Sequence, residues 1–175
     1  MALALLTGLI TDTENFSNPG TTEHSLKVAS ELIRHGANFN SLKNWFLHDK
    51  PVEALKLWGV ALSRLTKNES LDIVYTFITL EDLKTHNASE AESEGIANFL
   101  NSAGEGRASL VLKETWDGKI KGSFRTTRDD FDVSLIASAL GGGGHKKASG
   151  FLIADGIDEA LAKIWETIEK TKESV

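Results

Sequence analysis

The chain has 175 residues and a mass of 19.0 kDa, which suits one large domain or two small ones, and its hydrophobic (41%) and charged (25%) fractions are those of a globular protein rather than a disordered one. It contains no cysteine, which excludes disulfides, thiolate zinc sites and cysteine nucleophiles. The formal net charge of −6 excludes a broad electrostatic attraction to nucleic acid, so phosphate binding would have to be local.

The longest apolar run covers residues 1–10. It is too short to span a bilayer and lacks the basic flank of a signal peptide. We therefore expect a soluble, cytoplasmic protein that does not bind membranes. The run begins without a polar lead-in, as if the sequence started in the middle of a domain.

Helical patterns dominate the first third of the chain. Residues 11–21 are rich in Asn, Ser, Pro and Gly and predict a loop. Apolar residues at helical spacing predict a helix over residues 22–35, with Gly36 as its stop, and a second short helix from Ser41.

A longer helix is expected to follow, with Pro51 as its first residue and its end near residues 67–68, where we place a candidate boundary. The residues expected to form its apolar stripe are Val52, Leu55, Trp58, Leu62 and Leu65.

The pattern changes to mixed strands and helices beyond this point. Residues 71–80 form a compact apolar run typical of a buried strand. Ser89 and Glu92 form a capping box that predicts the start of a helix. Two β-rich runs, 107–115 and 119–126, flank an Asp-Gly pair and predict a hairpin.

The end of the chain predicts two helices on either side of a glycine-rich segment. Asp132 is placed to cap a helix that ends near Leu140. After the glycine-rich segment, residues 151–154 predict a short strand. The closing helix carries Ile157, Leu161, Ile164 and Ile168 on one face.

Four consecutive glycines, Gly141, Gly142, Gly143 and Gly144, precede His145 and Lys146. Glycine lets the backbone approach a ligand closely, and successive N–H groups in such a turn form an anion-binding nest. The adjacent histidine and lysine add charged donors. The alternative is a flexible linker, which is disfavoured because linkers are usually Gly/Ser mixtures between domains.

Ser123 and Arg125 lie at the end of the second hairpin strand, where alternation places both side chains on one face. A hydroxyl beside a guanidinium fork suits phosphate or carboxylate recognition. The alternative is an ordinary solvated arginine.

Asp12 follows the apolar opening segment and begins a polar loop, a position from which a carboxylate can be held at a cleft. An isolated aspartate is more often a cap or turn residue. By itself it cannot hold Mn²⁺ or Mg²⁺, which need several oxygen or imidazole ligands.

Taken together, these segments resemble the DHH phosphoesterase superfamily, in particular its oligoribonuclease and phosphoadenosine-phosphate phosphatase branch, also called exopolyphosphatase-related. The residues that carry the resemblance are 8–13 (GLITDT), Phe16, 21–22 (TT), 123–125 (SFR), 132–134 (DVS) and 141–151 (GGGGHKKASGF). The glycine-histidine segment is similar to the first subtype of DHH-associated domain. The resemblance covers essentially the whole chain but only the C-terminal portion of the family's full length.

The resemblance implies an α/β fold: residues 1–50 as a helical remnant of the DHH catalytic domain, 51–68 as a connecting helix, and 69–175 as a small mixed α/β DHH-associated domain that binds substrate. It implies that Asp12 is a metal ligand and that Arg125 and the segment from Gly141 to His145 bind substrate. Family members hold two Mn²⁺ ions through four motifs, of which this chain carries the fourth alone.

We therefore expect this chain to be the C-terminal part of a Mn²⁺-dependent phosphoesterase acting on short oligoribonucleotides or bisphosphonucleotides, able to bind nucleotide phosphate but without catalysis by itself. One alternative is a non-catalytic nucleic-acid-binding module. Another is a cyclic-dinucleotide phosphodiesterase of the same superfamily. The apolar surface of residues 1–10 makes a homodimer an expected form.

Overall fold

The computed structural model describes residues 1–13, 15–18, 20–42, 50–101 and 104–172. The chain divides into two compact units, Met1–Lys50 and Pro51–Val175. Each unit is described by itself. Among the described helices, none combines the length and apolar composition that a membrane span requires.

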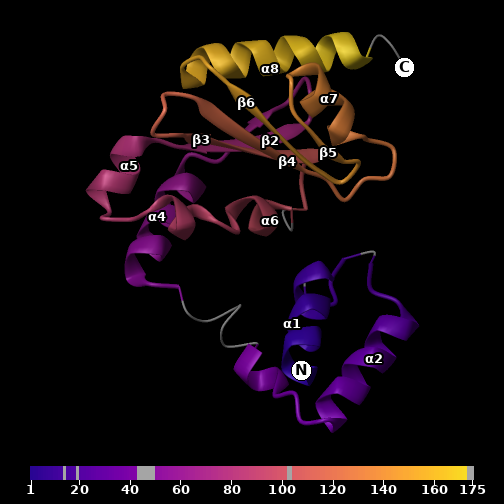
Figure 1. Cartoon of the computed structure of the whole chain (residues 1–175). Helices are drawn as coiled ribbons and strands as arrows, with labels where there is room; N and C mark the ends of the chain where they lie inside the picture. Colours follow the sequence, from indigo (N-terminus) through magenta and orange to yellow (C-terminus); the bar gives the residue numbers. More distant parts are fainter. Residues whose placement is uncertain (14, 19, 43–49, 102–103, 173–175) are drawn as a thin grey trace. The chain divides into compact units, whose positions relative to one another are not determined.

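The first unit is helical (Figure 1). Helix α1 covers Ala2–Asp12 and α2 covers Glu23–Arg34, as the sequence predicts for α2. Gly36, at φ +91°, ends α2 in a Schellman turn in which the N–H groups of Gly36 and Ala37 bond to the carbonyls of Ile33 and Leu32. The buried residues that join the helices are Leu6, Ile10, Ala29, Ala37 and Leu42.

The short helix expected from Ser41 begins earlier, since residues 39–42 are helical. Asn38 caps it, because its side-chain oxygen accepts the N–H of Ser41 at 3.1 Å. The remainder of that predicted helix lies outside the described residues.

The second unit is a mixed six-stranded sheet between helices, which confirms the expected α/β class (Figure 1). The strand order is β1-β2-β3-β4-β6-β5, with β2 and β3 parallel and the other neighbours antiparallel. The strands are β1 (Thr66–Asn68), β2 (Ile73–Ile78), β3 (Ala108–Glu114), β4 (Ile120–Arg125), β5 (Gly143–His145) and β6 (Ala148–Ile153).

Helices cover the two faces of this sheet unequally. On one face, α7 (Val133–Ala139) and α8 (Ile157–Lys172) bury a large core that includes Phe124, Phe151 and Ile164. The other face carries α4 (Val52–Ser63), α5 (Leu80–Thr85) and α6 (Ile96–Leu100) over a smaller core. Among the described residues, this smaller core takes its strand members from β2 and β3 alone. We call the part of this second face formed by β4, β6 and β5 the open face.

The expected stripe of α4 is wrong except at Trp58, which packs against the smaller core. Val52 and Leu55 are 59% and 55% exposed, and the helix instead buries Ala54, Leu57 and Ala61. Small alanines let the helix approach β2 closely, where the hydroxyl of Thr76 donates to the carbonyl of Ala61. The helix also ends at Ser63, earlier than predicted, because residues 66–68 pair with β2 as β1.

The region between β2 and β3 differs from its prediction in two ways. The short helix α5 was not expected; Thr79 and Asp82 cap it reciprocally. The capping box of Ser89 and Glu92 forms, but it opens a 3₁₀ turn, η1 (Glu90–Ser93), rather than a continuous helix. Gly95, at φ +90°, separates this turn from α6.

The predicted hairpin, the helix capped by Asp132 and the closing helix are all confirmed. The predicted strand 151–154 is the second half of a longer strand, β6. Its partner β5 was not expected, because glycine has a low strand propensity.

Candidate phosphate-binding site

The first two glycines of the run end helix α7. The N–H groups of Gly141 and Gly142 donate to the carbonyls of Ser138 and Ala137 at 3.0 and 2.7 Å, and Gly141 has φ +81°. This is a Schellman turn, in which both N–H groups are hydrogen-bonded to carbonyls of the helix and are not available to an anion. The predicted anion nest therefore does not extend over these two residues.

The last two glycines belong to the edge strand β5. A Cβ at Gly142 would lie 2.1 Å from the carbonyl oxygen of Gly150, and one at Gly144 would lie 2.6 Å from that of Ala148. At Gly143 a Cβ would meet no atom within 4 Å, and its φ is not in the left-handed region. The chain's own packing thus requires glycine at 142 and 144, whereas the surface at Gly143 is bare for an approaching ligand.

Strand register brings the predicted residues together on the open face. Gly143 pairs with Gly150, which also pairs with Ser123. In the next row, His145 pairs with Ala148, which also pairs with Arg125. Residues directly opposite on neighbouring strands present side chains on the same face, so these two rows lie on one surface.

The floor between the predicted side chains is made of small residues, because Ala148 and Gly150 occupy the central strand β6. The intervening residues of β4, Gly122 and Phe124, are buried on the opposite face. Ser123 and Arg125 thus lie on one side of this surface of small residues and His145 lies on the other. We call this surface, with its flanking side chains, the shelf.

Arg125 is held in place by its own backbone and by α6. Its Nε donates to Oδ1 of Asn98 at 2.9 Å, and Nη1 donates to the carbonyl of Phe124 at 2.9 Å. No hydrogen bond joins its Nη2 to any residue in the described ranges. One edge of the guanidinium is therefore oriented and able to receive an anionic oxygen. The sequence did not predict a role for Asn98. It lies far from Arg125 along the chain, and no local pattern indicates that the two side chains meet.

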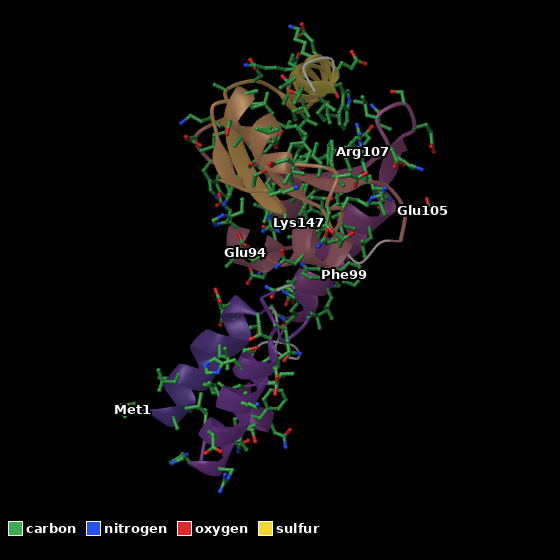
Figure 2. The ribbon with its side chains drawn as sticks, turned by 90° about the vertical axis from the view of Figure 1, so that its right-hand side faces the viewer. Met1, Glu94, Phe99, Glu105, Arg107 and Lys147 are labelled. Atoms are coloured by element: carbon green, nitrogen blue, oxygen red, sulfur yellow. The ribbon has the colours of Figure 1, made fainter. Side chains whose placement is uncertain are left out.

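The two lysines after His145 form the tip of the β5–β6 hairpin (Lys147 is labelled in Figure 2). Nζ of Lys147 donates to the carbonyl of Thr127 at 2.9 Å and pairs with Asp129 at 2.7 Å. The hydrogen bond from Lys147 lowers the pKa of Asp129. Lys147 thus fastens the hairpin, whereas Lys146 and His145 are exposed.

Asp12 belongs to the first unit, where it is the last residue of α1 and is exposed. The loop after it is tightly folded: Asn15 and Phe16 have left-handed φ values of 58° and 62°, and the N–H of Phe16 bonds to the hydroxyl of Thr13. Across the described residues, no group of three or more His, Cys, Asp or Glu side chains is arranged to hold a metal ion.

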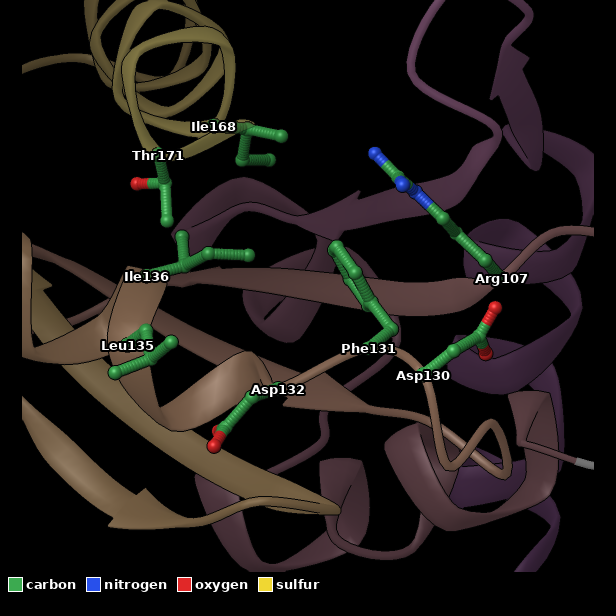
Figure 3. A pocket seen from close by; sticks show the side chains of 8 residues that line it. All are labelled: Arg107, Asp130, Phe131, Asp132, Leu135, Ile136, Ile168 and Thr171. Atoms are coloured by element: carbon green, nitrogen blue, oxygen red, sulfur yellow. The ribbon is translucent and has the colours of Figure 1, made fainter. Parts of the chain in front are cut away.

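A separate pocket of about 300 Å³ lies on the α7–α8 side of the sheet (Figure 3). Arg107 stacks over the ring of Phe131 at 4.3 Å, and its Nε donates to the carbonyl of Leu71. The remaining walls are mostly apolar, with Asp130 and Asp132 at the edge. Two carboxylates disfavour a phosphate there, so this pocket is not the anion site that the sequence predicts.

Comparison with known proteins agrees with the resemblance seen in the sequence. The family model of the DHHA1 domain matches residues 70–171. The chain is 29% identical to the bifunctional oligoribonuclease and PAP phosphatase NrnA of Thermus thermophilus, covering 97% of this chain and 50% of that protein. For NrnA of Bacillus subtilis the identity is 30%, over 95% of this chain and 52% of that protein.

Among solved structures, the chain is similar to an exopolyphosphatase-related protein from Bacteroides fragilis, with a TM-score of 0.88 and 26% identity over 98% of this chain and 50% of that one. The chain therefore spans about half the length of the relatives it matches. Since the matching family model covers more than half of the chain, and includes the shelf on the open face, this protein belongs to the DHHA1 domain family.

Proposed function

We propose that the open face binds the phosphate groups of a nucleotide or short oligonucleotide, and that the chain serves as the substrate-binding part of a DHH-type phosphoesterase. The observation that carries this proposal is the register that puts Arg125 and His145 in one row and Ser123 and Gly143 in the next. Two relatives that the chain resembles are named for acting on oligoribonucleotides and PAP, which supports the same ligand class.

The chemistry of the shelf suits phosphate in three ways. The guanidinium of Arg125 is oriented by Asn98 and the carbonyl of Phe124, which leaves the N–H donors of Nη2 for an anionic oxygen. The bare backbone at Gly143 lets an oxygen approach without meeting a Cβ. His145 and Lys146 add exposed donors beside it.

In this proposal residues 69–175 form the substrate-binding domain, residues 51–68 connect it, and residues 1–50 are part of the catalytic domain. The resemblance implies two Mn²⁺ ions in that catalytic domain. The described residues do not fit such a centre, because Asp12 offers one exposed carboxylate and no cluster of ligands surrounds it. No hydrolytic step is therefore assigned to this chain, and we expect it to show negligible Mn²⁺-dependent hydrolysis by itself.

The binding proposal is tested by replacing both hydrogen-bonding side chains of one row, Arg125→Ala with His145→Ala, and titrating with adenosine 3′,5′-bisphosphate or a short oligoribonucleotide. Two lost charge-assisted contacts of about 1.5 kcal/mol each correspond to roughly 100-fold weaker binding. The matched control, Arg128→Ala with His24→Ala, removes the same residue types from exposed positions outside the shelf. Equal affinities for the two double variants would overturn the proposal.

Catalysis is tested separately, by incubating the purified chain with Mn²⁺ and a labelled oligoribonucleotide. We expect no product above the rate without protein. Rapid release of mononucleotides by this chain would show that it does assemble a metal site. It would refute the proposal that this chain binds substrate but does not hydrolyse it by itself.

A further inference from the structure

The pocket beside Arg107 and Phe131 plays no part in the proposed function. Its walls come from the residue before β3, the segment before α7, α7 itself and the last turns of α8 (Figure 3). It lies on the α7–α8 side of the sheet, where Phe124 is buried, whereas Ser123 and Arg125 point to the open face. The sheet therefore separates this pocket from the shelf.

Most of the pocket wall is apolar, and the space is large enough for a small molecule. Its volume of about 300 Å³ lies at the lower end of the range for ligand sites. Ile136 and Ile168 are buried members of the large core, while Leu135 is 50% exposed at the rim. The ring of Phe131 adds a flat surface beside them. A compact aromatic ring would bury much apolar area against such walls.

Arg107 brings one polar group that the described part of the chain does not satisfy. Its Cζ lies 4.3 Å from the centre of the Phe131 ring, and its Nε donates to the carbonyl of Leu71 at 3.0 Å. Figure 3 shows the guanidinium and the Phe131 ring pointing toward the same space. Nη2 is buried and has no hydrogen-bond partner among the described residues. A buried donor without a partner is unfavourable, so a ligand that supplies an acceptor oxygen would remove this cost.

The two carboxylates at the edge of the pocket already have partners. Asp130 accepts from Nε and Nη2 of Arg128 at 3.2 and 3.3 Å, and Asp132 accepts from the N–H of Ser134 at 2.9 Å. The hydrogen bonds from Arg128 and Ser134 lower the pKa of Asp130 and Asp132, so both are ionised at neutral pH. An anionic ligand is repelled by these carboxylates, and a cationic ligand is repelled by Arg107. An uncharged ligand meets neither repulsion.

We propose that this pocket binds a compact, uncharged aromatic molecule that carries a carbonyl oxygen. The ring of the ligand packs against Phe131, Leu135 and Ile168, and the carbonyl oxygen accepts a hydrogen bond from the guanidinium of Arg107. The site is separate from the shelf and stands whether or not the open face binds phosphate.

The test titrates the chain with benzamide, a minimal member of this ligand class, and with benzoate, which has the same ring and a negative charge. Amide chemical shifts report where each probe binds. We expect benzamide to bind with a dissociation constant of about 1–10 mM and to shift Phe131, Leu135 and Thr171 most. Benzoate should bind about fivefold more weakly, because Asp130 and Asp132 repel it.

Two variants test the walls. Leu135→Glu replaces an exposed apolar rim residue with a charge, and we expect benzamide to bind about 10-fold more weakly. Arg107→Lys keeps the positive charge but loses the planar set of donors, and should weaken benzamide about fivefold. The matched control is Leu152→Glu, which changes the same residue type at a 55% exposed position on the open face. It should leave the benzamide affinity within about twofold of wild type.

The site is refuted if the wild-type chain does not bind benzamide, or if Leu135→Glu binds it as tightly as Leu152→Glu does. Benzoate binding as tightly as benzamide would overturn the assignment of an uncharged ligand. Excess adenosine 3′,5′-bisphosphate should leave the benzamide titration unchanged, and displacement of benzamide would contradict the separation of the pocket from the shelf.

Discussion

The two units differ in how completely they bury their apolar residues. In the second unit, a sheet packed by helices holds fully buried side chains such as Phe124, Leu110 and Ile164. In the first unit, α1 and α2 bury one side and leave exposed a set of large apolar residues: Leu3, Leu5, Leu26, Val28 and Ile33. The second unit is thus stabilised by its own core, while the first presents apolar surface that its own helices do not cover.

The largest effect on stability is expected from a substitution in the core of the second unit. Phe124→Ala removes a fully buried ring that packs against Phe151, and we expect a loss of about 3–5 kcal/mol in the free energy of unfolding. Denaturant unfolding followed by fluorescence reports it, since Trp165 packs edge-on against Tyr75 in the same unit. Leu152→Ala, at a half-exposed position, is the control and should cost less than about 1 kcal/mol. Equal losses would contradict the assignment of the core.

The glycine run allows stability and binding to be separated within one segment. Gly142→Ala would place a Cβ 2.1 Å from a carbonyl oxygen, and we expect it to destabilise the second unit by about 2–3 kcal/mol in thermal unfolding. Gly143→Ala meets no atom and should leave stability nearly unchanged while weakening phosphate binding. A stability loss at Gly143 equal to that at Gly142 would remove the reason for treating its surface as a ligand site.

A substitution at Asp82 tests whether the contact between the end of α4 and the rest of the second unit contributes to the free energy of unfolding. Arg64, which follows α4, donates to both carboxylate oxygens of Asp82, and Asp82 also accepts from Thr79. Burial alone raises the pKa of Asp82, but the hydrogen bonds from Arg64 and Thr79 outweigh it, so its pKa is lower than usual. We expect Asp82→Asn to cost about 2 kcal/mol at pH 7.

The sign of the pH dependence follows from this lowered pKa. The carboxylate contributes stability above its unfolded pKa of about 3.9 and loses it as pH falls through the lower folded value. The difference between wild type and Asp82→Asn should therefore shrink on acidification below about pH 4. A difference that stays constant or grows would show that ionised Asp82 does not stabilise the junction with α4.

The smallest effect is expected on the exposed surface of the first unit. Leu5 is 58% exposed on α1, so Leu5→Ser should change the free energy of unfolding by less than about 0.5 kcal/mol while raising solubility. Sedimentation at increasing concentration measures the second effect. A large destabilisation would mean that Leu5 is packed, and the contrast between the units would be weaker than described.

Much of the fold could be predicted because local signals agree with tertiary packing. The Asp-Gly hairpin, the cap at Asp132 and the stripe of α8 are all local patterns. Helix α4 is apolar on several sides, so its pattern fits two stripes equally, and only the packing of Ala61 beside Thr76 selects one. Strand β5 could not be predicted, because glycines pair there through partners on β6 and not through propensity.

The candidate site was predictable in its parts but not in its assembly. Alternation along β4 correctly places Ser123 and Arg125 on one face. The meeting of Arg125 with His145 depends on the register of three strands, and the support from Asn98 depends on a contact between distant segments. The division of the glycine run between a helix cap and an edge strand also requires the tertiary structure, because each glycine has the same local sequence signal.

The most direct test of the account is an amide chemical-shift map of the chain titrated with a short oligoribonucleotide. We expect the largest shifts on the open face, at Ser123, Arg125, Gly143 and His145. Shifts that cluster instead around the pocket of Arg107 and Phe131, or in the first unit, would contradict the claim that the open face is where this protein binds phosphate.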